Sequence, residues 1–134
     1  MKIDGSCHCG AIVYEAELKP ENVGLCHCTD CQKLSASAFR TIGVVEPGAF
    51  KLVKGEPKVY IKTGESGNKR EQTFCPNCGS GLYATSPGAG PKAHNLRMGT
   101  VNQRDQFSPQ FQAWCRSAAS WLPKISTPND LEKQ

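Results

Sequence analysis

Three cysteines lie within six residues of one another in the segment LCHCTDCQKLS (25–35). They are Cys26, Cys28 and Cys31, called the triplet below. Thiolates are good ligands for soft metal ions such as Zn²⁺, and a closed tetrahedral site takes four ligands. Three protein ligands with one open position are instead typical of a catalytic zinc. The identity of the fourth ligand therefore decides what this segment does.

Four more cysteines lie in two pairs, within the motifs CHC (7–9) and CPNCG (75–79). In the CPNCG motif, two thiolates converge across a tight turn, and the following glycine permits close backbone approach. In an extended CHC segment, the first and third residues face the same way, so both sulfurs can bind one ion. The histidines between the cysteines, His8 and His27, then face the opposite way and are expected to be surface residues or neighbours of a ligand.

The seven cysteines divide most simply into four and three. The triplet is so close in sequence that closing its loop around one ion costs little entropy. The remaining two pairs, called the quartet below, are Cys7, Cys9, Cys75 and Cys78. We predict that the quartet binds a structural zinc, which would contribute directly to folding. A site built from the two CHC segments would split the triplet and is less favoured.

Other assignments of the cysteines stay open at this point. The CPNCG pair could be a redox pair of the thioredoxin type, although no βαβ pattern surrounds it. Iron could replace zinc in the quartet. A fourth protein ligand, Cys115 or His94, could close the triplet site. We expect Cys115, which lies close to Phe111 and Trp114, to be a buried and inert thiol.

An open triplet site favours sulfur chemistry. Zinc with three thiolates carries a net negative formal charge, so it is a weaker Lewis acid toward water than zinc bound by three histidines. Such a soft site accepts another sulfur well. A thiol substrate, deprotonated by coordination, therefore fits better than hydrolysis by a metal-bound hydroxide.

Short β-rich runs, separated by Gly, Pro, Ser and Asn, must position these cysteines. No segment carries a sustained helical period, and the best helical candidates are 30–37 and 117–121. We expect a hairpin turn at 65–70 and a surface loop at 86–92. The pattern predicts a mainly β protein of antiparallel sheets with few short helices. The expected strands are 11–18, 38–46, 50–54, 58–63, 71–75, 81–85, 96–101 and 111–115.

The length of 134 residues suits a single domain, and a polar tail at 127–134 is expected to fray. The net charge of +4 is dispersed, with no basic block beyond Lys69-Arg70, so nucleic-acid binding is disfavoured. No signal sequence or apolar run of membrane-spanning length is present, which predicts a soluble cytoplasmic protein without membrane contact. In a reducing cytosol, paired cysteines are more often metal ligands than disulfides.

The motifs, taken in order, resemble the glutathione-dependent formaldehyde-activating family, which includes the centromere protein V group. They are CHCG, CHCxxCQKxSxS, FCPNCGSxL, RMGTV and AWxRSxxSW. The resemblance runs over residues 3–122, the expected zinc-binding domain, and leaves 123–134 as a C-terminal tail. It implies a β-tent fold with two zinc ions. Carried over residue by residue, Cys7, Cys9, Cys75 and Cys78 match the structural ligands, and Cys26, Cys28 and Cys31 match the catalytic ones.

The resemblance also implies a reaction. Glutathione adds to formaldehyde to give S-hydroxymethylglutathione, so the expected enzyme is a carbon-sulfur lyase acting on a small thiol and a small aldehyde. Zinc at the triplet would bind the glutathione thiolate beside the aldehyde carbon. The alternatives are a zinc-stabilised module that binds protein or nucleic acid, and a glutathione carrier without turnover.

Glutathione carries two carboxylates, which need cationic or backbone partners. Candidate cations near the motifs are Lys33, Arg40, Arg97 and Arg116. Candidate hydroxyl groups that would orient a substrate are those of Ser35, Ser37 and Thr100.

Overall fold

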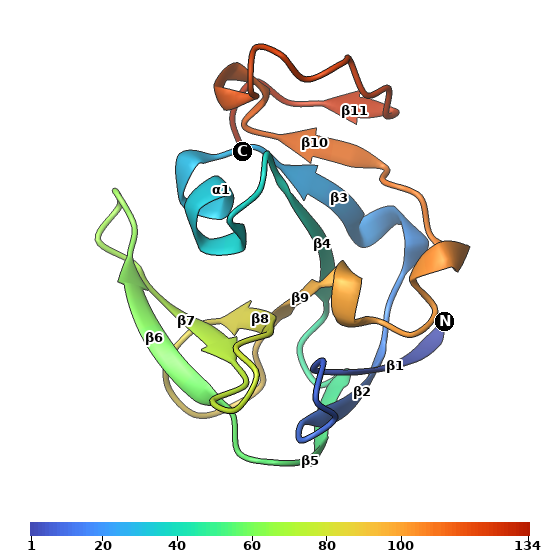
Figure 1. Ribbon diagram of the computed structural model, residues 1–134, viewed down its shortest axis with the longest axis vertical. Coiled ribbons are helices and arrows are strands. Elements are labelled where there is room, and N and C mark those ends of the chain that lie inside the picture. Colours follow the sequence, from blue (N-terminus) through green and yellow to red (C-terminus); the bar gives the residue numbers. More distant parts are fainter.

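The computed structural model describes all residues, 1–134, and confirms a mainly β fold. It has eleven strands in two sheets, one α-helix and four short 3₁₀ helices (Figure 1). The smaller sheet has the order β1-β2-β5, and both of its pairings are antiparallel. Its strands are β1 (Lys2–Ser6), β2 (Val13–Glu17) and β5 (Phe50–Lys54).

The larger sheet has eight strands in the order β11-β10-β3-β4-β9-β8-β7-β6. Its pairings are antiparallel except that β10 runs parallel to both β3 and β11, so the expectation of purely antiparallel sheets was wrong at this edge. The strands are β3 (Val23–Cys26), β4 (Arg40–Val45), β6 (Lys58–Thr63), β7 (Lys69–Phe74), β8 (Gly81–Thr85), β9 (His94–Arg97), β10 (Phe111–Ala113) and β11 (Asn129–Asp130).

The single α-helix, α1 (Thr29–Ser35), confirms the helix expected near 30–37. Figure 1 shows it between the β6–β7 hairpin and β3, and an ion pair of 2.8 Å joins Lys62 of β6 to Asp30 of α1. No helix is both long and apolar enough to cross a membrane. The 3₁₀ helices are η1 (Pro20–Asn22), η2 (Met98–Thr100), η3 (Arg104–Gln106) and η4 (Cys115–Ser117).

The polar tail is attached to the fold, whereas the sequence suggested that it frays. β11 pairs with β10, the amide of Leu131 donates to the carbonyl of Gln112 at 2.8 Å, and the amide of Cys115 donates to the carbonyl of Leu131 at 2.9 Å. The tail is mostly polar, and its one large apolar residue, Leu131, is exposed, but edge pairing needs only backbone groups. Backbone pairing of this kind leaves no signal in the sequence pattern.

Alternation along the strands gives the larger sheet two different faces. On one face, Thr73, Tyr83 and Leu96 are cross-strand neighbours and are buried. This face shares the main apolar core with Ile3 and Tyr14 of the smaller sheet. The opposite face carries the polar residues of the candidate site. The core therefore fixes which side chains can reach that site.

We expect Gly24→Ala to destabilise the protein by about 1–3 kcal/mol, because overpacking a close contact forces a shift of the backbone or of a neighbouring ring. Gly24 of β3 lies opposite Phe111 of β10, and a Cβ at Gly24 would come within 2.5 Å of the Phe111 ring. Thermal and urea unfolding measure the effect. Gly99→Ala is the matched control, because a Cβ there meets nothing within 4 Å. Equal stability of the two variants would contradict the prediction.

Candidate metal centres

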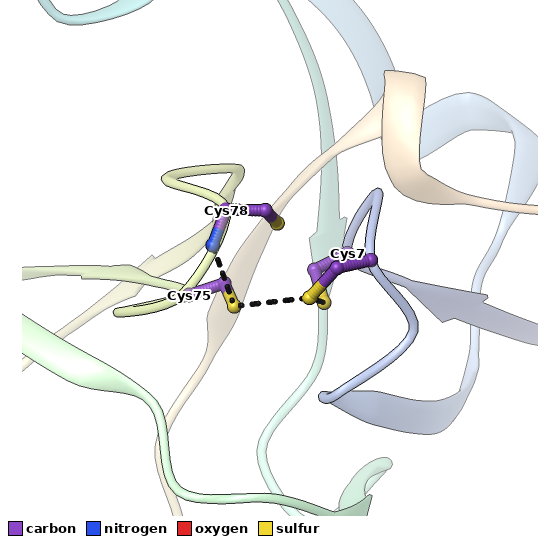
Figure 2. A group of neighbouring side chains, drawn as sticks. Cys7, Cys75 and Cys78 are labelled. Carbon is purple, nitrogen blue, oxygen red and sulfur yellow. Dashed lines mark hydrogen bonds between the residues drawn. The ribbon is translucent and has the colours of Figure 1, made fainter.

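The four sulfur atoms of the quartet lie within 4.8 Å of one another. Cys7 and Cys9 follow β1, while Cys75 and Cys78 follow β7, and Figure 2 shows Cys7 facing the other loop. The sulfur of Cys9 lies 3.7 Å from that of Cys7 and 3.8 Å from that of Cys75. Four sulfurs at about 2.3 Å from one tetrahedral zinc stand about 3.8 Å apart. The quartet thus has the spacing of a closed thiolate site.

Backbone amides support the quartet sulfurs. The amide of Ile12 donates to the sulfur of Cys7 at 3.3 Å, and the amide of Cys78 donates to the sulfur of Cys75 at 3.4 Å (Figure 2). Gly79, which follows Cys78, has a φ of +78°. This left-handed φ favours glycine, but a Cβ at Gly79 would meet nothing within 4 Å, so the close backbone approach expected from the sequence is not found. Amide donors of this kind favour the ionised sulfur that a metal requires.

Ser80 supports the same centre from its side chain. Its hydroxyl lies 3.3 Å from the sulfur of Cys78 and accepts a 3.0 Å hydrogen bond from the amide of His8. The hydroxyl is the main cause that lowers the pKa of Cys78 to about 5. Ser80 thereby connects the two loops of the quartet even though sequence reasoning gave it no role.

The triplet sulfurs also lie within 4.8 Å of one another. Cys26 ends β3, and Cys28 is the N-cap of α1, where its sulfur accepts a 3.2 Å hydrogen bond from the amide of Cys31. Hydrogen bonds with Cys26 and Cys31 lower the pKa of Cys28, whereas hydrogen bonds with Cys26 and Cys28 raise the pKa of Cys31. Three neighbouring sulfurs cannot all ionise without a compensating cation. The donor set and its spacing therefore fit a soft metal ion.

Neither sequence candidate for a fourth ligand joins the triplet. His94 pairs with Val45 and Thr85, so it lies on the core face of the sheet, where its ring stacks on Phe50 at 4.1 Å. Cys115 is half-buried rather than buried, and its sulfur points to the carbonyl of Gln112 at 3.8 Å. The chain thus provides three ligands at this centre.

The helix that carries Cys31 is held in place independently of the triplet sulfurs. The side-chain amide of Gln32 donates to the carbonyls of His27 at 2.8 Å and Ser117 at 2.9 Å. His27 is buried, and its Nε2 lies 2.8 Å from Oε1 of Gln112. His27 therefore supports the loop between Cys26 and Cys28 and does not belong to the candidate metal-binding group, in agreement with one of the two expectations for it. His8 is exposed, which agrees with the expectation that it is a surface residue.

A cavity of about 590 Å³ opens on the polar face of the larger sheet, next to α1 and the quartet loop. Of the four candidate cations, Arg40 and Arg97 line it, whereas Lys33 and Arg116 are exposed elsewhere. Of the candidate hydroxyls, Ser35 and Thr100 line it and Ser37 does not. The complete lining is Leu34, Ser35, Arg40, Tyr60, Gln72, Thr73, Phe74, Gly79, Ser80, Gly81, Arg97, Gly99 and Thr100.

Two guanidinium groups meet at one acceptor in this cavity. Oε1 of Gln72 accepts from Nη1 of Arg40 at 3.2 Å and from Nη2 of Arg97 at 2.8 Å. Burial lowers the pKa of Arg97 to about 9. Gln72 was missed by sequence reasoning because it lies within an ordinary strand and no motif marks it.

The profile of the glutathione-dependent formaldehyde-activating enzyme family matches residues 2–117. The chain belongs to this family. A protein of Halomonas elongata, provisionally named as a glutathione-dependent formaldehyde-activating enzyme, is 28% identical over 91 residues. That alignment covers 65% of this chain and 58% of the relative, so the chain spans less than two thirds of the relative's length.

A crystal structure of a Rhodobacter sphaeroides protein has the same fold, with a TM-score of 0.58 and 21% identity. The match covers 79% of this chain and 96% of the other. In this chain, all seven motif cysteines lie within residues 2–117, which match the family profile. They form two groups that could hold metal ions. The sequence suggested that these cysteines divide into a group of four and a group of three. The structure brings their side chains together in the same two groups.

Proposed function

We propose that the protein is a zinc-dependent carbon-sulfur lyase that joins or cleaves a thiol and a small aldehyde. Glutathione and formaldehyde are the substrates that the family name suggests. The quartet would hold a structural zinc, and the triplet a catalytic one. The observation that carries the proposal is that the triplet gathers three sulfurs with no fourth ligand from the chain, beside a cavity of about 590 Å³.

The two cysteine groups suit different tasks. The quartet joins segments that are 66 residues apart at Cys9 and Cys75, and such a closed site supports folding. The triplet lies within six residues and leaves a position for an incoming sulfur. A zinc ion held by the triplet would lower the pKa of a bound thiol and present it as a thiolate.

The chain's own residues would bind and orient the two substrates. The cavity would receive the body of the thiol compound, and α1, whose Leu34 and Ser35 line the cavity, carries Cys31. The new bond forms between the sulfur and the carbonyl carbon, while the proton lost by the thiol ends on the carbonyl oxygen. Much of the rate would come from holding the two reactants together in this orientation. The reverse reaction breaks the same carbon-sulfur bond.

Native mass spectrometry of protein purified without oxygen tests the proposal. We expect two zinc ions per chain and, after addition of glutathione, one retained glutathione per chain. Addition of formaldehyde should then give S-hydroxymethylglutathione faster than the uncatalysed reaction does. Two zinc ions with no retained thiol would contradict the open triplet site. A retained thiol without rate enhancement would indicate a carrier and contradict the lyase.

A further inference from the structure

Strand register places Cys26 of the triplet and the two cavity arginines on one face of the larger sheet. Cys26 of β3 lies opposite Arg40 of β4, and Ile42, two residues further along β4, lies opposite Arg97 of β9. Because side chains alternate along strands, all of these project to the same side. Gln72 of β7 lies opposite Ala84, which lies opposite Asn95, so Gln72 also projects to this side. The same face of the sheet therefore carries the Cys26 sulfur and, on the neighbouring strands, the guanidinium groups of Arg40 and Arg97.

The two arginines lack an anionic partner within the chain. Arg40 is only 7% exposed, and its Nε has no hydrogen-bond partner although it is buried. None of the four ion pairs in the structure includes Arg40 or Arg97. Burying an unpaired charge is costly, so buried guanidinium groups are normally matched by a carboxylate or phosphate. Here two of them share the single neutral oxygen of Gln72.

The triplet thiolates do not fill this role by direct contact. The hydrogen bonds of both guanidinium groups go to Gln72, and Arg97 also donates to the backbone and side-chain oxygens of Asn95. None goes to a triplet sulfur. Gln72 lies on β7, three strands from Arg40 on β4 and two strands from Arg97 on β9, so both guanidinium groups extend along the sheet toward β7, which lies on the side away from β3 and Cys26. Because β7 lies four strands from β3, an anion bound beside Gln72 would be separated from the Cys26 sulfur by several atoms of a bound substrate.

We propose that Arg40 and Arg97, aligned by Gln72, form a carboxylate subsite for the far end of the thiol substrate. This inference rests on the proposed function and specifies the thiol: it carries a carboxylate several bonds from its sulfur. In glutathione, the glycyl carboxylate fits best, because the γ-glutamyl carboxylate is partly neutralised by its neighbouring ammonium group. Guanidinium groups bind such a carboxylate with paired, charge-assisted hydrogen bonds.

The test compares glutathione with its glycyl monoethyl ester, using calorimetry on the metal-loaded protein. We expect the wild-type protein to bind glutathione about tenfold more tightly than the ester, because the ester loses charge-assisted hydrogen bonds. In the Arg97→Gln variant, the ratio of the affinity for glutathione to the affinity for the ester should fall to nearly one. Arg40→Gln is a second variant with the same expected loss.

Arg70→Gln is the matched control. Arg70 is a neighbouring cation whose guanidinium donates to the hydroxyl of Ser86 at 3.0 Å and not to Gln72. The control should keep the tenfold preference for glutathione. Loss of the preference in Arg70→Gln to the same extent as in Arg97→Gln would mean that a general positive potential is responsible, and would overturn the subsite.

S-methylglutathione separates this inference from the proposed function, because it keeps the carboxylate but cannot bind a metal as a thiolate. If S-methylglutathione is preferred over its own ester, but glutathione binds no more tightly than S-methylglutathione, the subsite is correct and thiolate coordination is wrong. If glutathione binds much more tightly than S-methylglutathione, but neither is preferred over its ester, coordination is correct and the subsite is wrong.

Discussion

Cys75→Ser is expected to leave little folded protein at 37 °C and to lower the metal content by one ion per chain. Cys75 is fully buried, and its sulfur lies 3.8 Å from that of Cys9, 66 residues earlier in the chain. Structural zinc sites contribute apparent free energies of about 10 kcal/mol or more, whereas whole domains are stable by only about 5–15 kcal/mol. Loss of the quartet metal therefore removes a large share of the total stability.

The two quartet loops are also joined by a hydrogen bond that does not involve the sulfur atoms. The amide of His8 donates to Ser80 at 3.0 Å, and this hydrogen bond crosses from the loop after β1 to the loop after β7. Ser80 and Gly79 line the cavity, so loosening these loops also disorders the cavity wall. We therefore expect the loss of thiol binding to follow the loss of folding in this variant.

Circular dichroism during thermal unfolding and elemental analysis of bound metal measure the two effects together. Cys115→Ser is the matched control, because Cys115 belongs to neither cysteine group. It should keep both metals and a melting temperature within about 5 °C of wild type. A Cys75→Ser variant that melts like the control would show that the quartet does not stabilise the fold.

The cysteine groups were predictable from sequence because metal sites depend on residue type and short spacing. CPNCG brings two sulfurs together across one turn, and CHC does so along one extended segment, whatever the rest of the fold does. The pairing of these two units also followed, since the compact triplet left them as the remaining four ligands. The structure brings together the same two sets.

The strands β3 and β11 were not predictable from local patterns. β3 (Val23–Cys26) is buried along its whole length, so it lacks the alternation that marks a strand with one exposed face. β11 (Asn129–Asp130) consists of two exposed polar residues, and only backbone pairing with β10 makes it a strand. In both cases the decisive partner lies far away in the sequence.

The cavity was only partly predictable for a related reason. Arg40 and Arg97 were candidates because they lie near motifs, but Lys33 and Arg116 had equal support. The fold separates the two pairs, because Arg40 and Arg97 lie on strands with side chains on the polar face, whereas Lys33 and Arg116 lie on helices outside the sheet. Gln72 gains its role from two arginines that belong to other strands. No short motif encodes such an arrangement.

Cys31→Ser is expected to lower the rate of thiol–aldehyde adduct formation at least about a hundredfold while leaving the fold intact. A serine hydroxyl is a poor ligand for a soft thiolate site, and loss of even an outer partner costs metal sites about 10–100-fold. The variant should retain one metal ion per chain, at the quartet, and should no longer retain glutathione in native mass spectrometry.

The fold should survive because α1 does not depend on the Cys31 sulfur. Gln32 anchors the helix to the carbonyls of His27 and Ser117, and the sulfur of Cys28 still caps its first turn. The triplet also closes only a short loop, so losing its metal releases little chain entropy compared with losing the quartet metal. The melting temperature should therefore stay within about 5 °C of wild type.

Lys33→Ala is the matched control for Cys31→Ser, because Lys33 is an exposed residue of the same helix and does not line the cavity. It should keep both metal ions, the retained glutathione and the full rate. If Cys31→Ser unfolds as Cys75→Ser does, the triplet is a second structural site. If it folds and still reacts at the control rate, the thiolate is activated elsewhere. Only selective loss of metal, thiol binding and rate in a folded Cys31→Ser protein agrees with a triplet that works as the reactive centre.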